Sequence, residues 1–196
     1  MLQNPIILAS QSPRRKQLLQ WAEIPFEVVL QETNEWYPDN LSPQEVAIYI
    51  ARNKALAVKA IVPAGKLILA ADTIVVLGHQ IIGKPRNRQH AIDILQQLSG
   101  NTHQVITGVV IIKDDTEIAF ADITQVEFHN LTTAQLQFYV DKYQPYDKAG
   151  AYAIQEWIGV VGIKNVQGDF YNVMGLPVSR VVQQLISLDA EASEHT

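Results

Sequence analysis

Cysteine is absent from this chain of 196 residues. It therefore has no disulfide framework, no thiolate nucleophile and no zinc site built on cysteine. Because a reducing compartment suits such a chain, we expect a cytoplasmic protein. The sequence also lacks any apolar run near the ~18 residues of a membrane span, and its first residues show no basic region followed by a long apolar stretch. We therefore expect no membrane partner.

A surplus of basic charge is also missing. Fifteen lysines and arginines face 20 aspartates and glutamates, which gives a formal net charge of −5. Non-specific nucleic-acid binding needs many cations to neutralise phosphates, so we expect no nucleic-acid partner. Several common motifs are absent too: the Gly-x-x-x-x-Gly-Lys-Ser/Thr phosphate loop, Gly-x-Gly-x-x-Gly, His-Glu-x-x-His and Gly-x-Ser-x-Gly. The histidines show no ligand-like spacing, and His103 and His129 are expected to be packing or surface residues.

The composition is that of an ordinary globular protein. Hydrophobic residues make up 47% and charged residues 18% of the chain, which is enough apolar material for a sizeable core. We expect a single domain over residues 1–188, because no repeat, linker or compositional break divides it. Residues 189–196 are polar and acidic without apolar periodicity, which predicts a disordered tail.

Apolar runs alternate with helical patterns and turn signals along the chain. The expected strands cover residues 6–9, 26–30, 66–77, 80–82, 105–113 and 117–128, with strand-like stretches at 151–154 and 160–166. Helices are expected from residue 13, then over 43–60, 88–98, 133–141 and 178–188. The short polar turn between the strands at 105–113 and 117–128 favours antiparallel pairing. The pattern therefore predicts an α/β fold with a mixed, partly antiparallel sheet flanked by helices.

The first candidate site is the turn Ser10-Gln11-Ser12-Pro13-Arg14-Arg15, where a buried strand meets the start of a helix. Backbone N–H groups and the helix dipole attract anions at such a turn, and guanidinium groups match phosphate oxygens. The alternative is that Ser12 and Pro13 only cap the helix while both arginines are solvated. Basic residues at a helix N-terminus oppose the dipole, which slightly disfavours this alternative. Both interpretations stay open.

The second candidate is Asp72, which lies inside the most apolar segment of the chain and precedes Thr73. An ionised carboxylate in a strand core is unfavourable unless it is paired, hydrogen-bonded or bound to metal. One interpretation is a general base for water or an oxygen ligand of Mg²⁺ or Mn²⁺. The other is a structural salt bridge, or a side chain turned outward.

Two further segments carry polar groups of interest. Gly83-Lys84-Pro85-Arg86 is a cationic turn in which glycine and proline fix the backbone, whereas Lys54 lies in a helix where lysine is usually solvated. In the segment 147–155, Gln155 offers the donor and acceptor that reading a base edge requires. A simple turn into a strand is the alternative for that segment.

Five motifs in this order resemble those of the Maf family of nucleoside triphosphate pyrophosphatases. They are Leu8-Ala-Ser-Gln-Ser-Pro-Arg-Arg15, Ala71-Asp-Thr73, Gly83-Lys-Pro85, Leu98-Ser-Gly100 with His103, and Asp147-Lys-Ala-Gly-Ala-Tyr152 with Gln155. The resemblance implies a mixed α/β fold of two lobes with a cleft, similar to inosine triphosphate pyrophosphatases. It also implies a homodimer. The chain differs in having Ala153 and Glu156-Trp157 around Gln155, where glycines are common in the family.

The resemblance also implies roles for individual residues. Asp72 would be the catalytic proton acceptor and would share a divalent cation, Mg²⁺ or Mn²⁺, with Glu35. The phosphate-binding residues would be Ser10, Arg15, Lys54 and Lys84. Substrate choice would fall to Arg14, Thr73 and Gln155.

The Asp147–Tyr152 motif with Gln155 is similar to the branch of the family that hydrolyses dTTP and UTP. The sequence therefore predicts a pyrophosphatase that takes these nucleoside triphosphates to the monophosphate and pyrophosphate. Two alternatives stay open. One is a nucleotide-binding regulator of cell division without turnover, and the other is a purine-directed pyrophosphatase acting on inosine or xanthosine triphosphate.

Overall fold

The computed structural model describes the backbone of residues 4–194 and the side chains of residues 4–188. Its contacts group the chain into two compact units. Unit 1 contains the chain up to Asp72, residues 107–122 and the chain from Gly175 onward. Unit 2 contains residues 73–106 and 123–174. The predicted extent of a single domain over residues 1–188 stays a prediction.

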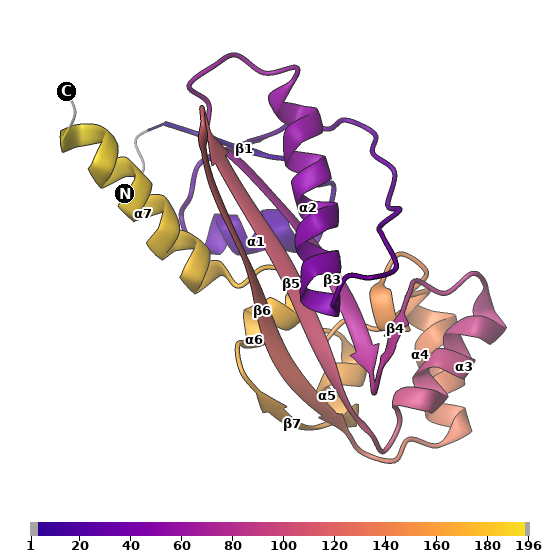
Figure 1. Cartoon of the computed structure of the whole chain (residues 1–196). Helices are drawn as coiled ribbons and strands as arrows, with labels where there is room; N and C mark the ends of the chain where they lie inside the picture. The colour runs from indigo at the N-terminus through magenta and orange to yellow at the C-terminus, as the bar shows by residue number, and fades with distance from the viewer. Residues whose placement is uncertain (1–3, 195–196) are drawn as a thin grey trace. The chain divides into compact units, whose positions relative to one another are not determined.

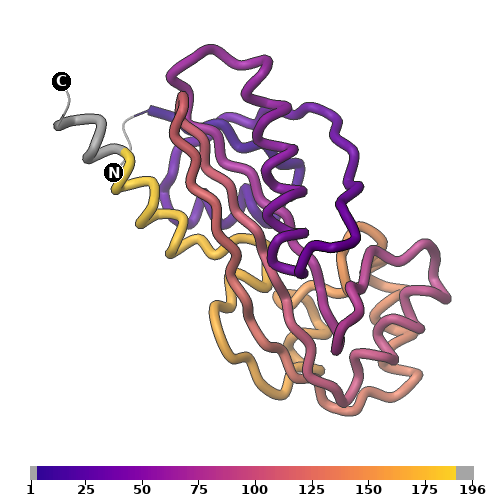
Figure 2. The backbone as a smooth tube through the Cα atoms, viewed as in Figure 1, coloured from indigo at the N-terminus to yellow at the C-terminus, as the bar shows by residue number. Residues whose placement is uncertain are grey.

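Strands and helices alternate along the first part of the chain (Figure 1). The strands are β1 (Ile6–Leu8), β2 (Phe26–Val28), β3 (Ile68–Leu77), β4 (Gln80–Ile82), β5 (Thr102–Lys113), β6 (Thr116–Phe128) and β7 (Ile163–Gln167). The helices are α1 (Pro13–Trp21), α2 (Pro43–Lys59), α3 (Arg88–Leu98), α4 (Thr133–Tyr143), α5 (Trp157–Gly162), α6 (Phe170–Met174) and α7 (Val178–Glu194), with a 3₁₀ turn, η1, at Ala149–Ala151. Figure 2 traces the same path as a tube.

The strands form one seven-stranded sheet in the order β2-β1-β3-β5-β6-β7, with β4 paired to β3. β1 is parallel to both β2 and β3, whereas the β3–β4 and β6–β7 pairs are antiparallel. β5 and β6 are hydrogen-bonded neighbours joined only by Asp114 and Asp115, a connection too short for a parallel crossover. The predicted mixed, partly antiparallel α/β fold is therefore confirmed.

In unit 1, the helix α2 packs on one face of β1, β3 and β5. The buried side chains between them are Ile7, Ala9, Ala51, Ala55, Val58, Ile68, Ala70, Val110 and Ile112. Because side chains alternate along a strand, Ile6, Leu8 and Leu69 point to the other face, and these are also buried. Figure 1 draws α1 on the side of the strands away from α2. Burial on both faces explains why these strands are continuous apolar runs in the sequence.

The start of α2 follows its sequence signal. Ser42 Oγ accepts a hydrogen bond from the Glu45 backbone N–H at 3.4 Å, and the Glu45 carboxylate accepts one from the Ser42 N–H at 2.8 Å. This reciprocal capping box satisfies two backbone donors that a helix N-terminus leaves without intrahelical partners. Pro43, which has no N–H, occupies the first turn. The boundary of α2 is therefore fixed by local sequence.

Gly108 of β5 sets how closely α2 approaches the sheet. A Cβ atom at this position would lie 2.3 Å from the carbonyl carbon of Ala47 and 2.4 Å from the amide nitrogen of Ile48. These contacts are with helix backbone, which cannot move aside as a flexible side chain would. Glycine therefore allows α2 to approach the strand this closely, about two helical turns before Lys54.

Replacing Gly108 with alanine should destabilise the protein by about 1–3 kcal/mol, because α2 must shift away from β5. Urea unfolding followed by circular dichroism measures the change. Gly83→Ala is the matched control, since a Cβ there meets nothing within 4 Å, and it should stay within about 0.5 kcal/mol of the parent protein. Equal stability of the Gly108 and Gly83 variants would show that this approach does not constrain the helix.

Unit 2 contains a buried aromatic cluster. The ring of His103 lies 5.4 Å from that of Phe128 and 5.5 Å from that of Tyr152, measured between centroids. His103 Nε2 is hydrogen-bonded to the Tyr152 hydroxyl at 2.7 Å. Burial lowers the pKa of His103 to about 4 and raises that of Tyr152, so both are neutral at pH 7. The structure thus places His103 in the interior as a packing residue.

Because the pKa of His103 falls from 6.5 in the unfolded chain to about 4 in the folded protein, its contribution to stability is complete above pH 6.5 and is lost as the pH falls toward 4. His103→Gln should therefore reduce the loss of stability between pH 7 and pH 4.5 by about 2 kcal/mol. Urea unfolding at the two pH values measures it. An unchanged pH dependence in the variant would contradict a neutral, buried imidazole.

Some predicted elements differ from those observed. Residues 151–154, expected as a strand, contain the end of η1 and a turn, because Gly150 and Ala151 adopt positive φ angles of 71° and 57°. Residues 160–162 belong to α5, and the extended segment begins only at Ile163. Neither α5 nor α6 was predicted.

The last helix also continues beyond its predicted end at residue 188, and α7 reaches Glu194. The tail predicted for residues 189–196 is therefore helical in its backbone to residue 194, and residues 195 and 196 lie outside the described part of the chain. Alanine and glutamate in this segment have high helix propensity, which favours continuation even without an apolar stripe. No helix among the described residues combines the length and the hydropathy needed to cross a membrane.

Candidate functional site

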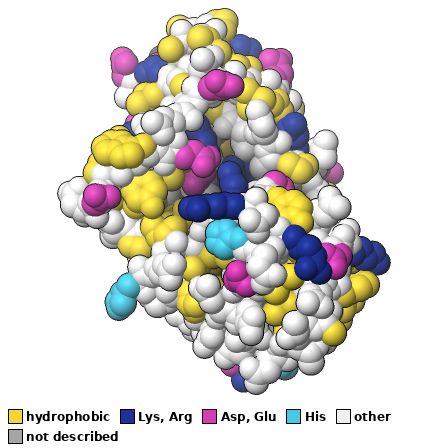
Figure 3. Space-filling view, turned by 90° about the vertical axis from the view of Figure 1, so that its right-hand side faces the viewer, with side chains coloured by type: hydrophobic (Ala, Val, Ile, Leu, Met, Phe, Trp, Pro, Cys, Tyr) yellow, Lys and Arg dark blue, Asp and Glu magenta, His cyan; other side chains and the backbone are white. Residues whose placement is uncertain are grey.

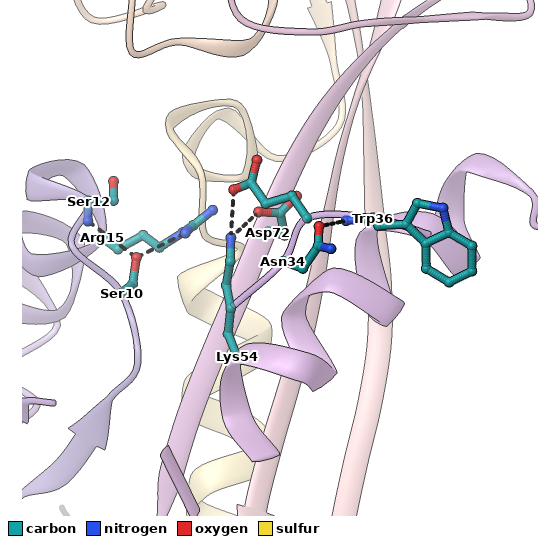
Figure 4. A network of polar contacts seen from close by, with 8 residues as sticks. Ser10, Ser12, Arg15, Asn34, Trp36, Lys54 and Asp72 are labelled. Atoms are coloured by element: carbon teal, nitrogen blue, oxygen red, sulfur yellow. Dashed lines mark hydrogen bonds and ion pairs between the residues drawn. The ribbon is translucent and has the colours of Figure 1, made fainter. Parts of the chain in front are cut away.

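The turn between β1 and α1 is organised around the hydroxyl of Ser10. Ser10 Oγ accepts hydrogen bonds from the Ser12 backbone N–H at 3.3 Å and from Arg15 Nη1 at 3.0 Å. Arg15 Nε donates to the carbonyl oxygen of Gly175 at 2.8 Å. Figure 4 shows the Arg15 side chain bonded to Ser10 beside Ser12. The guanidinium group is thus fixed at two points before any ligand binds.

These contacts bear on the two interpretations of the turn. Ser12 occupies the N-cap position of α1, as expected, but its side chain makes no capping hydrogen bond. Arg15, which the alternative left solvated, is only 8% exposed, and Arg14 is half-buried. The burial of Arg15 argues against the alternative in which both arginines are solvated, and the anion-binding interpretation stays a prediction.

Lys54 joins the two predicted acidic residues. Its Nζ atom lies 2.6 Å from Asp72 Oδ1 and 3.4 Å from Glu35 Oε1 (Figure 4). The side chains of Lys54 and Asp72 are 21% and 15% exposed, whereas that of Glu35 is 55% exposed. Lys54 is therefore not an ordinary solvated lysine, because it neutralises a carboxylate inside the central strand β3.

The buried arginine lies in the field of these carboxylates. Burial lowers the pKa of Arg15 to about 10, Asp72 and Glu35 act to raise it, and Arg14 acts to lower it. Arg15 therefore remains charged at neutral pH. Unit 1 thus brings together six of the predicted residues, which are Ser10, Arg14, Arg15, Glu35, Lys54 and Asp72.

The other three predicted residues, Thr73, Lys84 and Gln155, belong to unit 2. Lys84 and Gln155 are exposed, and Thr73 is half-buried in β3 directly after Asp72. The Gly150 backbone N–H donates to the Gly83 carbonyl oxygen at 3.2 Å. This bond joins the turn that carries Lys84 to the segment that leads to Gln155.

Sequence reasoning missed the residues that hold the predicted ones in place. Gly175 accepts the Arg15 hydrogen bond across 160 positions of sequence, and nothing local to Arg15 signals it. Tyr139 and Glu156 contact the segment around Gln155. A tyrosine buried in a helix offers no sequence signal for such a role.

Comparison with known proteins decides the family. The model of the Maf-like proteins matches residues 5–188, which includes every motif named above. The chain belongs to the Maf family.

Named relatives align over nearly the whole chain. The protein of Cytophaga hutchinsonii named dTTP/UTP pyrophosphatase is 51% identical over 180 residues, covering 92% of this chain and 82% of that protein. The protein of the same name from Parabacteroides distasonis is 47% identical over 190 residues, covering 94% and 98%. Among solved structures, the Staphylococcus aureus Ham1 protein superposes with a TM-score of 0.44 at 17% identity over 65% of this chain and 73% of that one, too slight a likeness for any inference.

The Maf site has the donor chemistry for a hard divalent cation. Glu35 and Asp72 lie near each other, since Lys54 Nζ is 3.4 Å from Glu35 Oε1 and 2.6 Å from Asp72 Oδ1. Within the described residues, no group of three or more histidine, aspartate or glutamate side chains is arranged to hold a metal ion. Two carboxylates fit a Mg²⁺-like ion that takes its remaining ligands from phosphate oxygens and water.

Removing the Lys54 ammonium should leave the Asp72 carboxylate unpaired within β3. Lys54→Met is expected to lower the free energy of unfolding by about 1–3 kcal/mol at pH 7, and adding Asp72→Asn should restore at least half of the loss. Urea unfolding of the parent, both single variants and the double variant gives the coupling energy. Strictly additive effects would mean that the two side chains do not depend on each other.

Proposed function

We propose that this Maf protein hydrolyses dTTP and UTP between the α- and β-phosphates, giving the nucleoside monophosphate and pyrophosphate. The observation that supports this proposal most directly is the Lys54–Asp72 ion pair, in which Nζ and Oδ1 are 2.6 Å apart. The pair lies in the electrostatic field of the buried Arg15. Relatives named dTTP/UTP pyrophosphatase, 51% and 47% identical over nearly the full chain, support the substrate class.

Binding the triphosphate is the first task of the site. The ligand carries close to four negative charges, so cations must neutralise it before water can approach phosphorus. Arg15, fixed by Ser10 and Gly175, presents donors without losing side-chain freedom on binding. In the proposal Ser10, Arg15, Lys54 and Lys84 hold the phosphate oxygens.

Activation of water is assigned to Asp72. The carboxylate takes a proton from a water molecule whose oxygen attacks the α-phosphorus. As the new bond between phosphorus and oxygen forms, the bond from the α-phosphorus to the bridging oxygen breaks and pyrophosphate leaves. Lys54 orients the Asp72 carboxylate through its hydrogen bond.

A divalent cation, Mg²⁺ or Mn²⁺, is part of the proposal, held by Glu35 and Asp72. When bound, it neutralises phosphate charge and orients the oxygens for in-line displacement. Arg14, Thr73 and Gln155 are assigned to selection of the base, for which the Gln155 amide offers both a donor and an acceptor. A cytoplasmic location and a homodimeric state, both expected from the sequence, belong to the same proposal.

Asp72→Asn should lower kcat by about 10²–10⁴-fold while leaving the fold intact, since this is the usual effect of losing a positioned base. Pyrophosphate release from dTTP and UTP with Mg²⁺ or Mn²⁺ measures it, and circular dichroism checks the fold. Asp115→Asn, in the exposed turn between β5 and β6, is the control and should keep full activity. Full activity of Asp72→Asn would contradict the role assigned to this carboxylate.

The same assay, extended to inosine and xanthosine triphosphates, separates the alternatives. A regulator of cell division would bind a triphosphate tightly without releasing pyrophosphate. A purine-directed enzyme would turn over inosine or xanthosine triphosphate faster than UTP. We do not expect a regulator, because the proton-accepting carboxylate and the cations that would hold phosphate occur together. We do not expect a purine-directed enzyme, because relatives 51% and 47% identical are named dTTP/UTP pyrophosphatase.

A further inference from the structure

One hydroxyl group holds both sides of Gln155. Tyr139, from α4, is fully buried, and its hydroxyl donates a hydrogen bond to Glu156 Oε2. The same oxygen accepts a hydrogen bond from the Ala153 backbone N–H at 3.2 Å. Ala153 and Glu156 enclose Ile154 and Gln155 in the sequence. The Tyr139 hydroxyl therefore contacts the backbone two residues before Gln155 and the side chain of the residue directly after it.

A second contact joins the beginning of the segment Asp147–Glu156 to its end. Lys148 Nζ lies 2.7 Å from Asp147 Oδ1 and 3.7 Å from Glu156 Oε1. The side chains of Lys148 and Glu156 are 11% and 22% exposed, so the pair is largely shielded from water. An ion pair in such a setting holds its partners more firmly than one on the open surface.

Backbone packing removes the remaining freedom. The Glu156 N–H donates to the Ala153 carbonyl oxygen at 3.1 Å, which closes a turn around Gln155. A Cβ atom on Gly159 would lie 1.6 Å from the carbonyl oxygen of Ile154, so the start of α5 is pressed against the turn. The segment is thus a rigid support, while the Gln155 side chain itself is exposed.

Rigidity matters for a glutamine that reads a base. Uracil and thymine present an acceptor at O4 beside a donor at N3, whereas cytosine presents a donor at N4 beside an acceptor at N3. A carboxamide has a donor and an acceptor of similar size, so a mobile one can turn to match either edge. Which group meets the base depends on where the backbone places the carboxamide relative to that edge.

We propose that Tyr139 and Glu156 are positioning residues that fix Gln155 and thereby set discrimination between uracil or thymine and cytosine. The proposal rests on the proposed function, because it takes Gln155 to be the residue that faces the base. Neither residue touches the substrate. Tyr139 acts through the Ala153 backbone N–H and the Glu156 carboxylate, and Glu156 acts through Tyr139 and through its own N–H bond to the Ala153 carbonyl oxygen.

Tyr139→Phe tests the hydroxyl while keeping the buried ring. The ratio of kcat/KM for UTP to that for CTP should fall by about tenfold or more, because a loosened amide accepts either edge. Tyr143→Phe is the matched control. Its ring stacks on that of Tyr139 with centroids 5.0 Å apart, and the variant should keep the parent ratio. Equal losses for UTP and CTP in Tyr139→Phe would indicate a merely structural role and overturn the proposal.

Glu156 is tested by a pair of variants. Glu156→Gln keeps an oxygen that accepts from Tyr139 and should hold the UTP to CTP ratio within about threefold of the parent, whereas Glu156→Ala should lose it as Tyr139→Phe does. Thermal unfolding of each variant confirms that it is folded at the assay temperature. Retention of the parent ratio in Glu156→Ala would overturn the proposal.

Equilibrium binding separates this proposal from the proposed function. Calorimetric titration of UTP and CTP into Asp72→Asn, with and without Tyr139→Phe, gives the same ratio as affinities and needs no turnover. Absence of pyrophosphate release by the parent protein would sink the proposed function while the affinity ratio still tests the positioning residues. An affinity ratio unchanged by Tyr139→Phe, or equal affinities for UTP and CTP in Asp72→Asn, would sink the positioning proposal alone.

Discussion

A carboxylate in the middle of an apolar strand must be neutralised, and the site of this protein is built around that requirement. Asp72 follows the fully buried Ala70 and Ala71 in β3. Its partner Lys54 comes from α2 and reaches it at 2.6 Å. The helix can deliver the ammonium group there because it lies close to β5, where Gly108 leaves room for helix backbone. Packing of the core and chemistry of the site are therefore linked through one helix.

Local sequence predicts some features of this arrangement but not others. The capping box at Ser42 and the exceptional charge at Asp72 are signals contained within a few residues, so the sequence predicts both the helix and the site residue. The partner of Asp72 was not derivable in this way, because lysine on a helix is usually solvated. The burial of Arg15 depends on Gly175, 160 positions away. Contacts of that range leave no local pattern, and family resemblance alone assigned these residues to one site.

The segment around Gln155 shows why the predicted strand at residues 151–154 was wrong. Small apolar residues suit a buried strand, but they equally suit a tight turn packed against a helix. Positive φ angles at Gly150 and Ala151 reverse the chain, and the Tyr139 hydroxyl then holds the turn. A glycine in the sequence shows that such a conformation is allowed, but it does not show that the conformation is adopted. Tertiary contacts with α4 decide it.

In the proposed reaction, water attacks the α-phosphorus of the nucleoside triphosphate. Hydrolysis of dTTP in water labelled with heavy oxygen, followed by mass spectrometry of the products, tests it most directly. Attack at the α-phosphorus should give thymidine monophosphate and pyrophosphate in equal amounts, with the label in the monophosphate. Release of orthophosphate, or label found in the pyrophosphate, would contradict it.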